Sequence, residues 1–138
     1  MSKELIERIK RHEGFSRHAY ACPAGYLTIG YGLNIEPSGY GLDEDLAEQA
    51  LCRVLLDVEG RLMDMPWFES LDLVRGGVVL EMAYQMGVSG MLGFRKMIEA
   101  IERKDWEAAA VEMLDSRWHQ QTPGRAKSLA RIMRTGES

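Results

Sequence analysis

The chain has 138 residues, of which 46% are hydrophobic and 28% are charged, and its formal net charge is −4. This length and this balance are typical of one globular domain, and they exclude disordered and collagen-like chains. The apolar runs are too short for a transmembrane helix, and the first ten residues lack the apolar segment of a signal peptide, so we expect neither an anchor nor self-directed export. Duplex-binding proteins normally carry a basic excess, so nucleic acid is not the expected partner.

Metal sites are not indicated by the sequence. Its two cysteines, Cys22 and Cys52, and its three histidines form no CxxC or HExxH pattern. Cys52 lies in a helical apolar stripe, so we expect a small buried side chain there. A disulfide between Cys22 and Cys52 is compatible with the sequence but not implied by it.

The chain begins with a predicted amphipathic helix, from about Ser2 to Glu13. Its apolar side chains recur at helical spacing: Leu5, Ile6 and Ile9. Ser2 is a candidate N-cap, and Gly14 stands where a helix commonly ends in a left-handed residue. In the next segment, residues 15–41, tyrosines alternate with glycines, and the run from Tyr26 to Tyr31 has high β-propensity. This segment therefore predicts a small, twisted antiparallel sheet.

Everything after Asp43, a candidate N-cap, is predicted to be helical. A helix of about five turns is followed by a break at Pro66–Trp67 and by a central buried helix over residues 72–86. Glycines then predict a tight turn: Gly87, Gly90 and Gly93. Three shorter helices are predicted over residues 94–102, 105–114 and 123–134, and the last opens with Thr122 as N-cap and Pro123 at the first position. Most of the nine methionines and the three tryptophans are expected in the core.

The predicted fold class is α+β, mainly α, with a small antiparallel β lobe packed on a helical bundle and a cleft between them. Residues 1–138 are expected to form one domain. Within it, residues 15–42 form the β lobe, residues 43–63 the connecting helix, and residues 1–14 and 64–138 the helical lobe.

Glu13 is the candidate general acid. It stands at the C-terminal end of the first helix, where the negative end of the helix dipole disfavours the carboxylate form. A carboxyl that stays protonated near neutral pH can protonate a leaving oxygen. A glutamate before a helix-ending glycine is also common at solvated helix ends, so Glu13 alone does not establish a site.

The residues around Glu13 carry a longer motif, which reads EGFSRHAYACPAGYLTIGYG from Glu13 to Gly32. This motif resembles that of the phage-type lysozymes, the T-even phage endolysin family of glycoside hydrolases. Further motifs of that family follow in the same order along the chain: Tyr84–Gly87, Gly93–Phe94, Trp106–Ala109, Ser116–Trp118, Gln121–Ala126 and Arg134–Gly136. The resemblance covers nearly the whole chain and implies a lysozyme-like fold.

The resemblance also implies the catalytic residues. Glu13 matches the family's proton donor to the glycosidic oxygen, and Thr28 matches the threonine that helps to hold the attacking water or the new anomeric oxygen. Cys22 stands at a position that is aspartate in many members and cysteine in some. Three roles remain open for Cys22: a thiolate that orients water or stabilises the oxocarbenium ion, a covalent nucleophile, or an inert small residue. The stereochemical outcome therefore also remains open.

Five further residues are implied to bind substrate. Tyr84 and Gln85 match the pair that lines the floor of the cleft, and Gly32 and Asn34 fall where the edge of the sheet meets the sugar. Arg125 matches an arginine that the family places near the catalytic glutamate, where its positive charge would oppose the effect of the helix dipole. The sequence therefore gives no net preference for either protonation state of Glu13. Arg125 belongs to a basic C-terminal stretch that either meets anionic wall polymer or faces solvent: Arg117, Arg125, Lys127, Arg131 and Arg134.

The function that the resemblance implies is that of a muramidase, which hydrolyses the β-1,4 bond between N-acetylmuramic acid and N-acetylglucosamine for host-cell lysis. We expect a monomer that acts on the peptidoglycan glycan strand without metal or organic cofactor, because side chains suffice for protonation and oxocarbenium stabilisation. It would wait in the host cytoplasm until a holin opens the membrane. Two alternatives remain, a lytic transglycosylase and a non-catalytic wall-binding relative.

Overall fold

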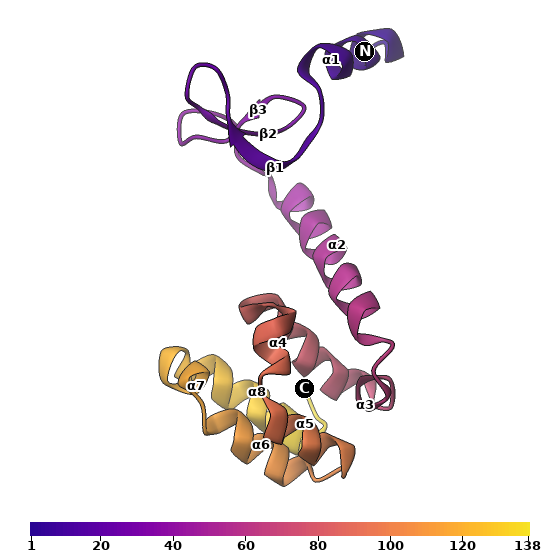
Figure 1. The fold of residues 1–138 in the computed structure, drawn as a ribbon, viewed down its shortest axis with the longest axis vertical. Coiled ribbons are helices and arrows are strands. Elements are labelled where there is room, and N and C mark those ends of the chain that lie inside the picture. The colour runs from indigo at the N-terminus through magenta and orange to yellow at the C-terminus, as the bar shows by residue number, and fades with distance from the viewer. The chain divides into compact units, whose positions relative to one another are not determined.

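The computed structural model describes all of residues 1–138, and its first helix is α1 (Lys3–Glu13) (Figure 1). The predicted N-cap is confirmed, because the hydroxyl of Ser2 accepts a hydrogen bond from the amide of Leu5 at 3.2 Å. Helix α1 ends at Gly14, as predicted, but this glycine has a φ of 70° and a ψ of 158°, which is not the left-handed helical conformation that was expected. A side chain makes that φ costly, so the glycine determines where α1 stops and where Glu13 stands.

The predicted antiparallel sheet is confirmed. It has three strands in the order of the chain, β1 (Ser16–Ala21), β2 (Leu27–Gly30) and β3 (Leu33–Asn34). Thr28 lies at its centre, because it pairs with Tyr20 of β1 on one side and with Asn34 of β3 on the other. A tight turn joins β1 to β2, with hydrogen bonds from Gly25 N to Cys22 O at 2.7 Å and from Cys22 N to Tyr26 O at 2.9 Å.

Seven helices follow the sheet: α2 (Glu44–Leu62), α3 (Pro66–Glu69), α4 (Leu73–Leu92), α5 (Arg95–Glu102), α6 (Trp106–Leu114), α7 (Arg117–Gln121) and α8 (Pro123–Thr135). Asp43 caps α2, as predicted, by accepting a hydrogen bond from Leu46 N at 2.8 Å. The observed helices therefore agree with those predicted from the sequence, except at four places where the prediction needs correction.

The corrections concern helix ends and caps. Pro66 begins the short helix α3 and does not only interrupt the chain, because proline is well suited to a first helical turn. The predicted turn after residue 86 is a kink inside α4, at Gly87 with a φ of 83°. Helix α7 was not predicted. Thr122 does not cap α8 with its side chain, because its hydroxyl donates to the carbonyl of Trp118 at 3.1 Å.

The chain divides into two compact units, residues 1–48 and 49–138. The first unit contains α1, the sheet and the start of α2, and the second contains the remaining helices. The confirmed fold class is therefore α+β with a small antiparallel sheet. The assignment of residues 1–14 to the helical lobe stays a prediction. No helix is both long enough and apolar enough to cross a bilayer.

The hydrophobic core lies in the second unit. Five of the nine methionines are fully buried in it, which confirms their predicted role: Met82, Met91, Met97, Met113 and Met133. Trp118 is buried, and Trp67 and Trp106 are half-buried against the core. Cys52 is exposed on α2, so its predicted burial is wrong, and both cysteines are free. Of α2, only Val58 and Leu62 are buried, which the apolar periodicity of the helix does not reveal.

Candidate active site

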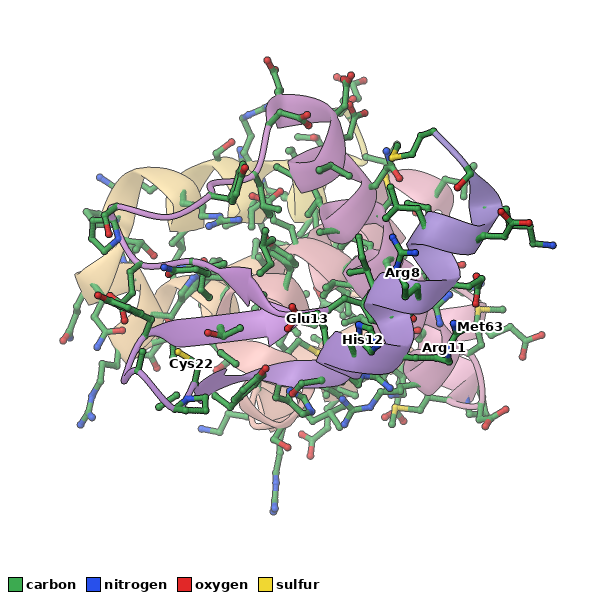
Figure 2. All side chains as sticks on the ribbon, turned by 90° about the horizontal axis from the view of Figure 1, so that it is seen from above. Arg8, Arg11, His12, Glu13, Cys22 and Met63 are labelled. Carbon is green, nitrogen blue, oxygen red and sulfur yellow. The ribbon has the colours of Figure 1, made fainter.

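Glu13 extends from the end of α1 beside the strands of the sheet, as Figure 2 shows. Its carboxyl group lies directly against Gly32. A Cβ atom at position 32 would collide with Glu13 Oε2 and would lie 2.9 Å from Glu13 Cδ. Gly32 also has a φ of 73°. Both the backbone conformation and the neighbouring carboxyl therefore require glycine at this position.

Cys22 and Thr28 lie together at the other end of β2, where the turn after β1 brings the chain back. Thr28 is the one buried polar residue of the protein, with 3% of its surface exposed. Its hydroxyl donates to the carbonyl of Tyr26 at 2.9 Å. The same carbonyl also accepts the amide of Cys22 at 2.9 Å, so it has two donors.

The thiol of Cys22 has a lowered pKa. The main cause is a hydrogen bond from the backbone of Tyr26, with partial burial acting in the opposite direction and further support from the backbone of Ala24 and the hydroxyl of Thr28. These donors favour the thiolate because they stabilise its negative charge. The thiolate form of Cys22 is therefore more readily populated than that of an ordinary cysteine.

Asn34 holds the loop that follows β3. Its Oδ1 accepts the amide of Glu36 at 2.9 Å, and its backbone carbonyl accepts the amide of Tyr40 at 2.8 Å. Gly39 packs so closely on the backbone of Asn34 that no Cβ would fit there. These bonds use the oxygens of Asn34 and leave its side-chain amide nitrogen for another partner.

Glu36 is a positioning residue that sequence reasoning missed. Its Oε1 accepts the amide of Leu27 at 2.8 Å, which extends the pairing of β2 beyond the end of β3. Leu27 directly precedes Thr28, so this bond helps to hold the buried threonine in place. No motif marks Glu36, because its partner is nine residues away and the bond depends on the conformation of the loop.

Three predicted site residues, Tyr84, Gln85 and Arg125, belong to the second unit. Gln85 Oε1 accepts the indole N–H of Trp118 at 2.9 Å, which leaves the amide nitrogen of Gln85 unused. Arg125 Nε donates to Glu81 Oε1 at 2.8 Å, and Glu81 is a second residue that the sequence did not indicate. Whether Arg125 acts on Glu13 stays a prediction.

The second unit contains two pockets near these residues. Tyr84, Glu81 and Arg125 line one of about 400 Å³ that is otherwise walled by leucines and a glycine. The other, of about 540 Å³, lies beside Trp118 and carries three basic side chains, Arg95, Lys96 and Arg117, together with Glu112 and Asp115. No cluster of His, Cys, Asp and Glu in the protein could hold a metal ion.

Known proteins similar to this chain include lysozymes. The family model described as phage lysozyme matches residues 10–135, a range that includes every predicted site residue. The probable T4-type lysozyme 1 of Dictyostelium discoideum is 27% identical, and the match covers 99% of this chain and 96% of that protein. The pre-baseplate central spike protein Gp5 of Enterobacteria phage T4 is 29% identical over 96% of this chain, which corresponds to 28% of Gp5.

Proposed function

Because this chain belongs to the phage lysozyme family, whose members are glycoside hydrolases, we propose that it is a muramidase that hydrolyses the β-1,4 bond between N-acetylmuramic acid and N-acetylglucosamine. The observation that carries the proposal is the carboxyl group of Glu13, which is solvent-exposed and lies against Gly32 within the family's motif. Membership of this family supports peptidoglycan degradation, and the choice of bond is our proposal.

Glu13 protonates the glycosidic oxygen in this mechanism. It is the last residue of α1, so its side chain extends from the helix end beside the sheet. The absence of a side chain at Gly32 leaves space for the carboxyl group. An exposed carboxyl can also take up a new proton from water after each turnover.

The hydroxyl of Thr28 acts as a proton rotor for Cys22, which means that it turns its proton to a different acceptor when the sulfur ionises. A hydroxyl has one proton and two lone pairs. While Cys22 is a thiol, Thr28 donates to the carbonyl of Tyr26 and accepts from the S–H group. When Cys22 ionises, the hydroxyl turns its proton to the thiolate. The carbonyl of Tyr26 keeps the amide of Cys22 as its donor, so it does not lose its last partner.

The thiolate of Cys22 then orients the water that attacks the anomeric carbon, in the place of the carboxylate base of inverting glycosidases. Asn34 and Gln85 each have a side-chain amide nitrogen that the fold leaves free, and each can donate it to the glycan. Gly32, Tyr84 and Arg125 are the other proposed glycan-binding residues. The enzyme needs no metal or organic cofactor for these steps.

A Glu13→Gln variant tests the proposal, with Glu4→Gln on the same helix as the matched control. Loss of the general acid should lower clearing of permeabilised cells by at least about a hundredfold, whereas Glu4→Gln should clear them like the parent. Equal clearing by Glu13→Gln and the parent would exclude the mechanism and favour a non-catalytic wall-binding protein.

A lytic transglycosylase is the second candidate, and Cys22 in the place of a carboxylate is the observation that favours it. A transglycosylase needs only one acid, because the sugar closes its own 1,6-anhydro ring. Mass spectrometry of the released muropeptides separates the two reactions. Reducing ends support the hydrolase, and anhydro ends support the transglycosylase.

The biological setting that fits this activity is host-cell lysis by a monomeric endolysin, made in the host cytoplasm and released to the wall by a holin. Expression in a bacterial host tests this setting. The parent protein should lyse cells only when a holin is expressed with it, and the Glu13→Gln variant should not lyse them in either case. Lysis without the holin would contradict the proposed release step.

A further inference from the structure

Helix α8 carries only basic charge. It contains no aspartate or glutamate and has four basic residues: Arg125, Lys127, Arg131 and Arg134. Its buried face consists of four apolar side chains: Ala126, Leu129, Ala130 and Met133. Lys127, Arg131 and Arg134 are exposed on the other side at spacings of four and three residues, so they form one row along the helix. At 1.5 Å per residue the row is about 10 Å long.

The three side chains of this cationic row have no acidic partner. Of the basic residues of α8 only Arg125 forms an ion pair, with Glu81. Arg131 contacts the backbone carbonyl of Glu137 at 3.5 Å, which leaves its charge uncompensated. The row therefore gives a protein of net charge −4 a local surface of the opposite sign.

We propose that Lys127, Arg131 and Arg134 form an exosite that holds the enzyme on the carboxylate-bearing stem peptides of peptidoglycan. This inference rests on the proposed function, because peptidoglycan is the polymer on which the enzyme would work. An acidic protein is repelled by a polymer that carries carboxylates, and the cationic row reverses that repulsion at one place.

The geometry of the row suits this partner. A length of about 10 Å corresponds to about three residues of an extended peptide. None of the three residues belongs to the proposed cleavage or glycan-binding site, so binding at the row would leave those residues free. The row would thereby raise the local concentration of an insoluble substrate.

The test compares two triple variants that lose the same charge. The first is Lys127→Gln, Arg131→Gln, Arg134→Gln. The matched control is Arg61→Gln, Arg103→Gln, Lys104→Gln, at three exposed cations that form no ion pair and lie outside α8. Both triples are made in the Glu13→Gln background, and their binding to purified sacculi is measured by sedimentation. Equal thermal unfolding midpoints verify that both are folded.

The first triple should bind sacculi about tenfold more weakly than the control triple at low salt, because each exposed charge pair contributes modestly. High salt, or amidation of the sacculus carboxylates, should remove this difference. When the first triple is made in the protein that keeps Glu13, it should cleave a short uncharged glycan at the same rate as the parent.

Two results would overturn the exosite. Equal loss of binding in both triples would show an effect of net charge alone. Reduced binding of the first triple to phosphatidylglycerol vesicles, with binding to sacculi unchanged, would identify a membrane as the partner. Sedimentation does not depend on catalysis, so failure of the exosite and failure of the Glu13 mechanism are distinguishable.

Discussion

The carboxyl group of Glu13 fills the space that a side chain at position 32 would need. Glu13 closes α1, whereas Gly32 follows β2, so the contact joins the first helix to the sheet. The glycine has a second reason to be there, since its φ is 73°. A substitution at position 32 would therefore act in two ways, and a neighbouring glycine makes it possible to separate them.

Gly32→Ala should abolish most activity, because the new Cβ displaces the Glu13 carboxyl, and should destabilise the fold by about 1–2 kcal/mol through its positive φ. Gly30→Ala is the control, because Gly30 has a similar φ of 67° but no atom within 4 Å of its Cβ position. Both variants should show a similar loss in urea unfolding, and Gly30→Ala should be the more active. Equal activity in the two would contradict the role of the contact.

Thr28→Val should raise the pKa of the Cys22 thiol, because it removes a donor to the thiolate. In a Cys52→Ser background, which leaves one thiol, the alkylation rate should reach its half-maximum at a higher pH than in the parent. Thr28→Ser keeps the hydroxyl and should restore the parent's profile. The Tyr26 carbonyl keeps its bond from Cys22 N in all variants, so stability should change little. An unchanged profile for Thr28→Val would exclude the proton rotor.

Substitutions of Cys22 separate its three roles. If the thiolate orients water, Cys22→Asp should retain or raise turnover, and Cys22→Ser should lower it by about a hundredfold or more. A glycosyl adduct on Cys22 in the mass spectrum of the parent would instead identify a covalent nucleophile. Turnover of Cys22→Ser at the parent's rate would show that the residue is inert.

Arg75→Ala should be the most destabilising substitution of a charged residue in the second unit. Its guanidinium lies 4.1 Å from the centre of the Trp106 ring and donates to the carbonyls of Met133 at 2.7 Å and Arg134 at 3.2 Å, near the end of α8. Loss of these contacts should cost about 2–3 kcal/mol in urea unfolding. Arg103→Ala, at an exposed helix end, should cost less than about 0.5 kcal/mol. Similar costs for both would contradict the role of Arg75.

Asp72, the N-cap of α4, should make the free energy of unfolding depend on pH in the acidic range. Desolvation alone would raise its pKa, but the amide and guanidinium of Arg75 lower it, and the net pKa is below its ordinary value. A lowered folded pKa adds stability that is complete above the unfolded pKa and is lost as pH falls through the folded value. The difference in unfolding free energy between the parent and Asp72→Asn should thus be constant above about pH 5 and shrink below about pH 4. A difference that grows on acidification would refute this assignment.

The local signals of the sequence predicted most of the fold. Ser2 and Gly14 bound α1, Asp43 begins α2, and the tyrosine–glycine pattern predicts the sheet, because caps, turns and apolar periodicity act within a few residues of the chain. The segment from Glu13 to Gly32 also sufficed to indicate the family, since its residue types and spacing are contiguous. Helix α7 escaped prediction because one turn is too short to show a period.

Contacts between distant residues were decided only by the tertiary structure. Glu36 reaches Leu27 across nine residues, Gln85 reaches Trp118 across 33, and Arg125 reaches Glu81 across 44. The exposure of Cys52 was also decided by the tertiary structure, because an apolar stripe in the sequence does not show which of its side chains other elements cover. The reason is that a hydrogen bond or a buried surface depends on where the folded backbone places both partners, and the spacing of residue types along the chain does not contain those positions.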